Sequence, residues 1–115
     1  MAMRTAFPEN VPGDWYVEQD CCIVCAVPLD EAPDLFQWAY PPGSAEPDHC
    51  YVARQPNSVD ELDRMINAAR NAEVECIRYR GIEERIRQRI RERGAAGAID
   101  VPDWMLTPSP PRAPR

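Results

Sequence analysis

The sequence predicts a small domain of the α+β class, and three observations lead to this prediction. The chain has 115 residues, a length that suits one domain with a modest core. Two segments, 59–71 and 83–93, have the apolar spacing of amphipathic helices. Three short segments, at 15–17, 49–54 and 74–79, contain the β-branched and aromatic residues typical of strands. Short strands and helices therefore alternate along one compact unit.

The clearest expected element is the helix over 59–71. Ser58 stands three residues before Glu61, which is the spacing of a capping box at a helix start. Apolar residues then recur at helical spacing and give the helix one buried face: Leu62, Met65, Ile66 and Ala69.

The other helices are shorter or less apolar. Glu83 to Arg93 is expected to be a solvated helix with a narrow isoleucine stripe, ended by Gly94 as its C-cap. A short helix is expected within Leu29–Phe36, limited to about two turns by a proline at position 33. The apolar residues of 98–106, including Trp104, are expected to pack back onto the core.

The ends of the chain and its hydropathy suggest a location. The last nine residues, 107–115, include four prolines, and we expect a disordered or polyproline-II tail. No stretch approaches the roughly 18 consecutive apolar residues of a membrane span, and the first residues lack an apolar signal-peptide core. These features predict a cytoplasmic protein without a membrane partner.

The charge distribution indicates what kind of partner to expect. The formal net charge is −6, and residues 1–81 carry fourteen acidic and six basic side chains. Such a surface argues against nucleic acid and for a protein partner with a basic docking surface. Five acidic residues near the cysteines are candidates for docking, although a generally solvated face explains them too: Asp20, Asp30, Glu31, Asp34 and Asp48.

The five cysteines are the residues most suggestive of chemistry. An odd number of cysteines in a reducing compartment fits metal ligands or free thiols better than a disulfide framework. The single histidine, His49, stands beside Cys50. We expect it to be an exposed residue at a strand edge, with metal ligation as the alternative.

Several motifs occur together in an order that resembles the single-cluster bacterial ferredoxins. The resemblance covers about residues 10–81, and each motif is weak alone. In chain order the motifs are Val11-Pro12-Gly13 before an aromatic strand, Cys22-Ile23-Val24-Cys25, Ala32-Pro33-Asp34-Leu35-Phe36, Tyr51-Val52-Ala53-Arg54-Gln55-Pro56, the acidic helix from Val59, and the isolated Cys76.

The resemblance implies a fold and a division of the chain. The family has a ferredoxin-like βαββαβ sandwich, which we expect over 10–81 as a cluster-binding domain. Residues 82–106 would then be a C-terminal helical extension, and 107–115 the proline-rich tail.

The resemblance also implies cluster ligands. Cys22 and Cys25 match two cysteines of the family's loop, and Cys76 matches its distant cysteine, as a cluster wrapped by one loop requires. Ile23, Phe36 and Ile77 would be its apolar cover.

This chain departs from the family's pattern at two of these positions. Pro28 occupies the place of the family's third loop cysteine, and Ile77 replaces the proline that usually follows the last one. Cys50 is the preferred fourth ligand, because adjacent cysteines seldom bind one site together; Cys21 and His49 are the alternatives. We expect a [4Fe–4S] cluster, with a [3Fe–4S] cluster or zinc as alternatives.

The expected function is the transfer of single electrons to or from a redox partner enzyme. The chain has no catalytic triad, phosphate-binding loop or zinc-protease motif, so we expect that it is not itself an enzyme. The alternative is a degenerate module of the same fold without a cluster, stabilised by zinc or acting in protein–protein interaction. A thiol redox protein using Cys22 and Cys25 is a third hypothesis, although the pair lacks the helix start that lowers a thiol pKa.

Overall fold

The computed structural model of the protein describes residues 4–106, and the expected tail at 107–115 lies outside them. The described chain is a mixed α+β domain, which confirms the predicted class. Its elements in chain order are β1 (Trp15–Val17), α1 (Val27–Glu31), β2 (Phe36–Ala39), β3 (His49–Val52), α2 (Val59–Asn71), β4 (Ile77–Tyr79), α3 (Glu84–Glu92), the 3₁₀ turn η1 (Ala96–Ala98) and α4 (Asp103–Leu106).

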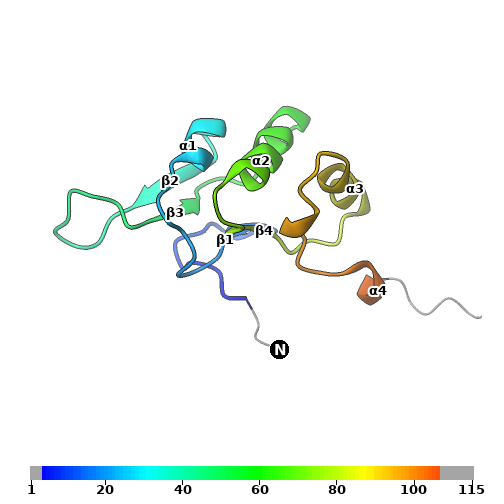
Figure 1. The fold of residues 1–115 in the computed structure, drawn as a ribbon, viewed down its shortest axis with the longest axis horizontal. Helices are drawn as coiled ribbons and strands as arrows, with labels where there is room; N and C mark the ends of the chain where they lie inside the picture. The colour runs from blue at the N-terminus through cyan, green and yellow to red at the C-terminus, as the bar shows by residue number, and fades with distance from the viewer. Residues whose placement is uncertain (1–3, 107–115) are drawn as a thin grey trace, which may run out of the picture.

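The strands form two antiparallel pairs rather than one continuous sheet. β1 pairs with β4, so that Trp15 lies opposite Tyr79, and β2 pairs with β3, so that Trp38 lies opposite Cys50. Figure 1 shows α1, α2 and α3 in a row on one side of the strands. The first and last strands of the 10–81 segment are therefore neighbours, which brings distant parts of the sequence together.

The side chain of Asn10 joins the two sheets. Its oxygen accepts hydrogen bonds from the backbone N–H of Val17 on β1 at 3.1 Å and of Val52 on β3 at 2.9 Å. Its amide nitrogen donates to the carbonyls of Phe7 and Val17. Because its oxygen accepts from one backbone N–H on each sheet, Asn10 acts as a short bridge between the sheets.

One apolar core runs through the molecule. Its largest fully buried apolar side chains are Trp15, Tyr79, Phe36, Leu35, Met65, Ile66, Ile77 and Ile90. The C-terminal extension supplies Ile90, Ala95 and Ala98 to this core. Residues 82–98 are therefore packed against the 10–81 segment.

The two longer helices follow their sequence signals. α2 spans Val59–Asn71 as predicted, and the Ser58 side chain accepts a hydrogen bond from the Glu61 N–H at 3.1 Å. α3 is one residue shorter at each end than predicted, and Gly94 follows it with a φ of 81°. Glycine adopts this left-handed conformation without strain, so it ends the helix.

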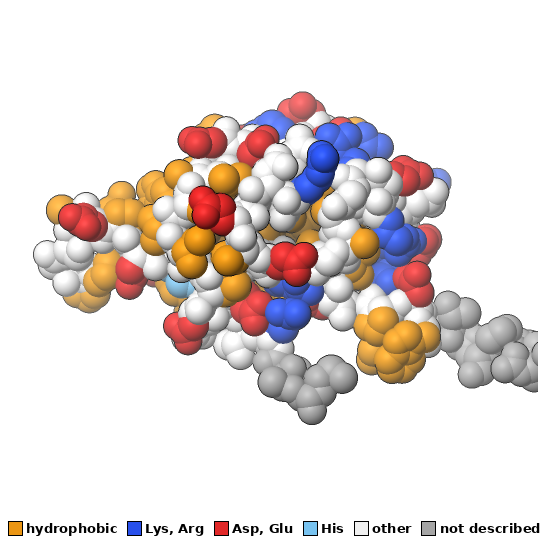
Figure 2. Space-filling view, viewed as in Figure 1, with side chains coloured by type: hydrophobic (Ala, Val, Ile, Leu, Met, Phe, Trp, Pro, Cys, Tyr) orange, Lys and Arg blue, Asp and Glu red, His pale blue; other side chains and the backbone are white. Residues whose placement is uncertain are grey.

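Two expectations about local structure are wrong. The first short helix begins earlier than expected and ends at Glu31, and Phe36 starts a strand instead. The residue before a proline is disfavoured in a helix, so Pro33 excludes Ala32 and the helix ends at Glu31. The second error concerns α4, where Trp104 is 76% exposed. Figure 2 shows apolar side chains gathered on the surface over α4, at the lower right.

The position of α4 depends on charge rather than on apolar packing. The Arg87 side chain is 0% exposed, and it pairs with Asp103 at the start of α4. Arg91 donates to the same carboxylate at 3.2 Å. α4 is therefore attached to the face of α3 that carries these two arginines. None of the helices within residues 4–106 has the length and apolar character that crossing a membrane requires.

Candidate functional site

The four cysteines predicted as ligands meet at one place. Cys22 and Cys25 lie in the loop between β1 and α1, Cys50 lies on β3, and Cys76 immediately precedes β4. All four line a small cavity of about 20 Å³. The rest of its lining is apolar: Ile23, Ala26, Pro28, Trp38, Ala72, Val74 and Ile77.

Cys22 and Cys50 are in direct contact. Their sulfur atoms lie 3.5 Å apart, and the backbone N–H of Val24 donates to the Cys22 sulfur at 3.3 Å. The hydrogen bond with Cys50 holds the pKa of the Cys22 thiol below its usual value. The same hydrogen bond, together with burial, raises the pKa of Cys50. This contact therefore favours the thiolate form on Cys22 and the thiol form on Cys50.

Cys76 forms a disulfide bond with Cys21, and their Cα atoms are 5.5 Å apart. The sequence argument against disulfides was wrong for this pair. The Glu18 N–H donates to the Cys76 carbonyl at 2.8 Å, so the chain just after β1 runs beside the start of β4. Cys21 and Cys22 thus have different partners, one near β4 and the other on β3. Cys22, Cys25 and Cys50 are free.

The loop that carries Cys22 and Cys25 has an unusual backbone. Asp20, Val24 and Ala26 have φ values of 64°, 59° and 69°. A left-handed conformation is uncommon for residues other than glycine and is a clear outlier for a β-branched one. Such strain costs about 1–3 kcal/mol per residue and is concentrated at functional sites. Here it accompanies the donation from the Val24 N–H to the Cys22 sulfur.

Other residues that the sequence singled out have different positions. His49 is buried rather than exposed, and its ring stacks on Phe7 with 3.9 Å between the centroids. Its Nδ1 lies 2.7 Å from the Cys50 carbonyl oxygen. Ile23 and Ile77 line the cavity, but Phe36 does not.

Two of the proposed docking acids have partners within the chain. Glu31 accepts a hydrogen bond from the neutral Asn71 amide at 3.1 Å, whereas Asp34 forms ion pairs. Asp34 pairs with Arg54 and Arg64, and Arg64 holds the pKa of its carboxyl at about 2. Its charge is therefore already balanced, which leaves it less suited to steering a partner than the other four acids.

The arrangement can be compared with what a metal would require. Two thiolates bound to one tetrahedral ion, each about 2.3 Å from it, lie about 3.8 Å apart, close to the 3.5 Å between Cys22 and Cys50. Within residues 4–106, no group of three or more His, Cys, Asp or Glu side chains is arranged to hold a metal. The donors are chemically suitable, but a full set requires opening of the Cys21–Cys76 bond and movement of the Cys22–Cys25 loop.

The sequence found four of the cysteines at this site and named Cys21 only as an alternative fourth ligand, not as a disulfide partner. The sequence gives no sign that Cys21 has a different partner from Cys22. The Cys21–Cys76 disulfide depends on the pairing of β1 with β4, which brings the two residues together. Comparisons with protein-family models, curated proteins and solved structures found no match to this chain.

Proposed function

We propose that this protein is a small acidic iron–sulfur protein of ferredoxin type that carries single electrons to or from a partner enzyme. The observation that supports the proposal best is the common cavity of Cys22, Cys25, Cys50 and Cys76. These residues come from three separate segments, and the surrounding side chains are apolar. The βαββαβ order of elements in residues 15–79 is consistent with the proposed ferredoxin-like topology.

The chain's own residues would have distinct tasks. Cys22, Cys25, Cys50 and Cys76 would hold a [4Fe–4S] cluster, which supplies reversible one-electron transfer when bound. The Val24 N–H already donates to the Cys22 sulfur, and such hydrogen bonds are one determinant of cluster potential. Trp38 and Ile77 line the inner wall of the cavity and would shield that side of the cluster from water. Ile23 is 53% exposed, so the loop side is where a partner could approach.

The disulfide sets a condition for this function. Cys76 cannot bind iron while its sulfur is bonded to Cys21. Two electrons and two protons from a dithiol reductant would convert the disulfide to two thiols, and Cys76 would then be available. Loading is therefore expected in reduced protein, and Cys21 is the one cysteine that loading does not need.

The test is anaerobic reconstitution with ferrous iron and sulfide after reduction with a dithiol, followed by iron and sulfide analysis. We expect a brown protein whose visible absorption is bleached by dithionite. Serine at position 22, 25, 50 or 76 should lower the iron content sharply, whereas the matched control Cys21→Ser should retain it. Equal iron contents in all five variants would contradict the ligand assignment.

A second function is favoured by one specific observation. The separation of the Cys22 and Cys50 sulfurs suits a single ion, and the cavity is small. A zinc-stabilised module that acts through protein–protein contacts is therefore the alternative. Colourless protein with about one zinc per chain and no sulfide would support it.

A further inference from the structure

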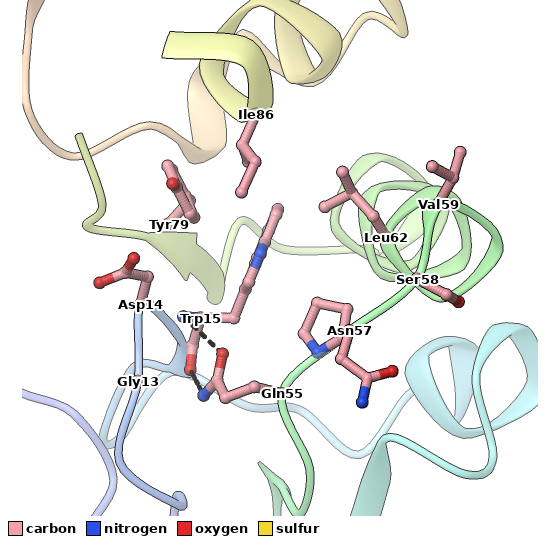
Figure 3. A pocket seen from close by; sticks show the side chains of 11 residues that line it. Gly13, Asp14, Trp15, Gln55, Asn57, Ser58, Val59, Leu62, Tyr79 and Ile86 are labelled. Carbon is pink, nitrogen blue, oxygen red and sulfur yellow. Dashed lines mark hydrogen bonds between the residues drawn. The ribbon is translucent and has the colours of Figure 1, made fainter. Parts of the chain in front are cut away.

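A groove between α2 and α3 has no part in the proposed function. It has a volume of about 600 Å³, which lies within the range of ligand-binding clefts. Figure 3 shows the Trp15 indole at its floor, with Tyr79 on one side, Leu62 on the other and Ile86 above. The groove shares no lining residue with the cysteine cavity, so it is a separate site.

The groove is elongated. A second depression, of about 300 Å³, shares Val59, Leu62 and Ile86 with it and extends along α3 to Glu92. The shared side chains are incompletely covered, since Val59 is 63% exposed and the other two are partly buried. Apolar surface of this kind is more favourable when it is removed from water. The shape therefore suits a stretch of peptide chain lying along the two helices better than a compact small molecule.

The floor of the groove contains a hydrogen-bond donor without an acceptor. Trp15 is 2% exposed, and its indole Nε1 has no partner among residues 4–106. An unpaired buried donor is costly, so an occupant that supplies an acceptor gains from this group. Leu62 and Ile86, which stand beside the indole in Figure 3, are only partly buried. A change of their rotamers would admit an acceptor atom.

One end of the groove carries an unbalanced negative charge. The Asp14 side chain is exposed and forms no hydrogen bond or ion pair within the described part of the chain. It lies beside Gly81, as does the Tyr79 hydroxyl. Burial raises the pKa of Tyr79, and the negative charge of Asp14 raises it further. The Arg80 guanidinium donates to the Gly13 carbonyl at 2.8 Å instead of pairing with Asp14, so this end complements an incoming cation.

These features together define the chemistry of an occupant. It has an apolar body, a carbonyl oxygen for the Trp15 N–H and a positive charge for Asp14. An α-helix uses its carbonyls in its own hydrogen bonds, whereas a polyproline-II segment leaves them free. Proline-rich segments also dock in aromatic-lined grooves and lose little conformational entropy there. The formal net charge of −6 further favours a basic partner.

We infer that the groove binds an extended, proline-rich segment of a partner protein that carries an arginine or a lysine. The prolines cover Val59, Leu62 and Ile86, a backbone carbonyl between them accepts from the Trp15 indole N–H, and the basic side chain pairs with Asp14. The protein is thereby attached to a partner through a site separate from its cysteines.

The test is an NMR titration of ¹⁵N-labelled, metal-free, disulfide-bonded full-length protein with a capped proline-rich peptide that contains a single arginine. The readout is the Trp15 indole N–H resonance, assigned with Trp38→Phe and Trp104→Phe variants. It should move downfield and saturate, as expected when the N–H gains an acceptor. A peptide with glutamate in place of the arginine should bind more weakly.

Two variants that change the net charge equally distinguish the local contact from the overall charge. Asp14→Asn should weaken binding of the arginine peptide about fivefold, the upper range for a solvent-exposed ion pair. The matched control, Asp48→Asn, removes an exposed carboxylate just before β3 that does not line the groove. It should leave the affinity unchanged.

Four results would overturn the inference. They are an indole resonance that does not respond to millimolar peptide, equal affinities for the arginine and glutamate peptides, equal losses of affinity in the two variants, and binding of n-butylammonium as tight as that of the peptide. The third would show that only net charge matters, and the fourth that the site takes a small amine. Because the protein is metal-free throughout, none of these results depends on whether the cysteines bind iron.

Discussion

Replacing Cys21 by serine removes the Cys21–Cys76 crosslink, and its effect on stability can be worked out from the chain. The two residues are separated by 55 positions. In the chain-entropy description, a loop of this length stabilises the folded state by about 4 kcal/mol. We therefore expect metal-free Cys21→Ser to have a free energy of unfolding lower by about that amount than the oxidised wild type.

Urea unfolding followed by tryptophan fluorescence measures this difference. With a slope of about 2 kcal/mol per molar urea, the midpoint should fall by about 2 M. Reduced wild type should unfold near the midpoint of the variant, because it lacks the same crosslink. Cys25→Ser keeps the disulfide and is the matched control, so its midpoint should stay close to that of the oxidised wild type. The reasoning is refuted if oxidised wild type and Cys21→Ser unfold at the same urea concentration.

Three further predictions concern single side chains. Asn10→Ala should lower the free energy of unfolding by about 2–3 kcal/mol, because four hydrogen bonds to backbone groups are lost, and a urea midpoint like the wild type's would count against the bridging role. Gly94→Ala should lower the free energy of unfolding by about 1–2 kcal/mol, because alanine is strained at a left-handed φ. An unchanged melting temperature would contradict this prediction. The pKa of Asp34 is depressed to about 2, so its contribution to stability is present above its unfolded pKa of about 3.9 and is lost as the pH falls toward 2. In Arg64→Leu, the free energy of unfolding should therefore fall less between pH 4 and pH 2 than in the wild type. Identical profiles of stability against pH for variant and wild type would contradict this prediction.

The parts of the fold that the sequence predicted are those set by local interactions. α2 has its start at Ser58 and its apolar face within one continuous segment, so its bounds could be predicted. α3 likewise carries its end signal, Gly94, next to it. In contrast, β2 begins at Phe36, the last residue of the segment expected to hold a short helix. Pairing with β3 decides its conformation, and nothing nearby in the sequence signals that pairing.

The sequence predicted which cysteines line the candidate site, but not which of them bond to one another. The resemblance selected Cys22, Cys25 and Cys76, and elimination selected Cys50. The bond between Cys21 and Cys76 follows from the neighbouring paths of β1 and β4, which the sequence does not specify locally. The burial of His49 has a similar origin, since its stacking partner, Phe7, precedes the first strand.

The most direct test of the iron–sulfur proposal is the content of iron and acid-labile sulfide in wild-type protein that has been reduced with a dithiol and reconstituted anaerobically. The account predicts roughly four iron and four sulfide per chain, and little of either when the reduction step is omitted. Reduced protein without sulfide, whether it contains about one zinc or no metal, would contradict it.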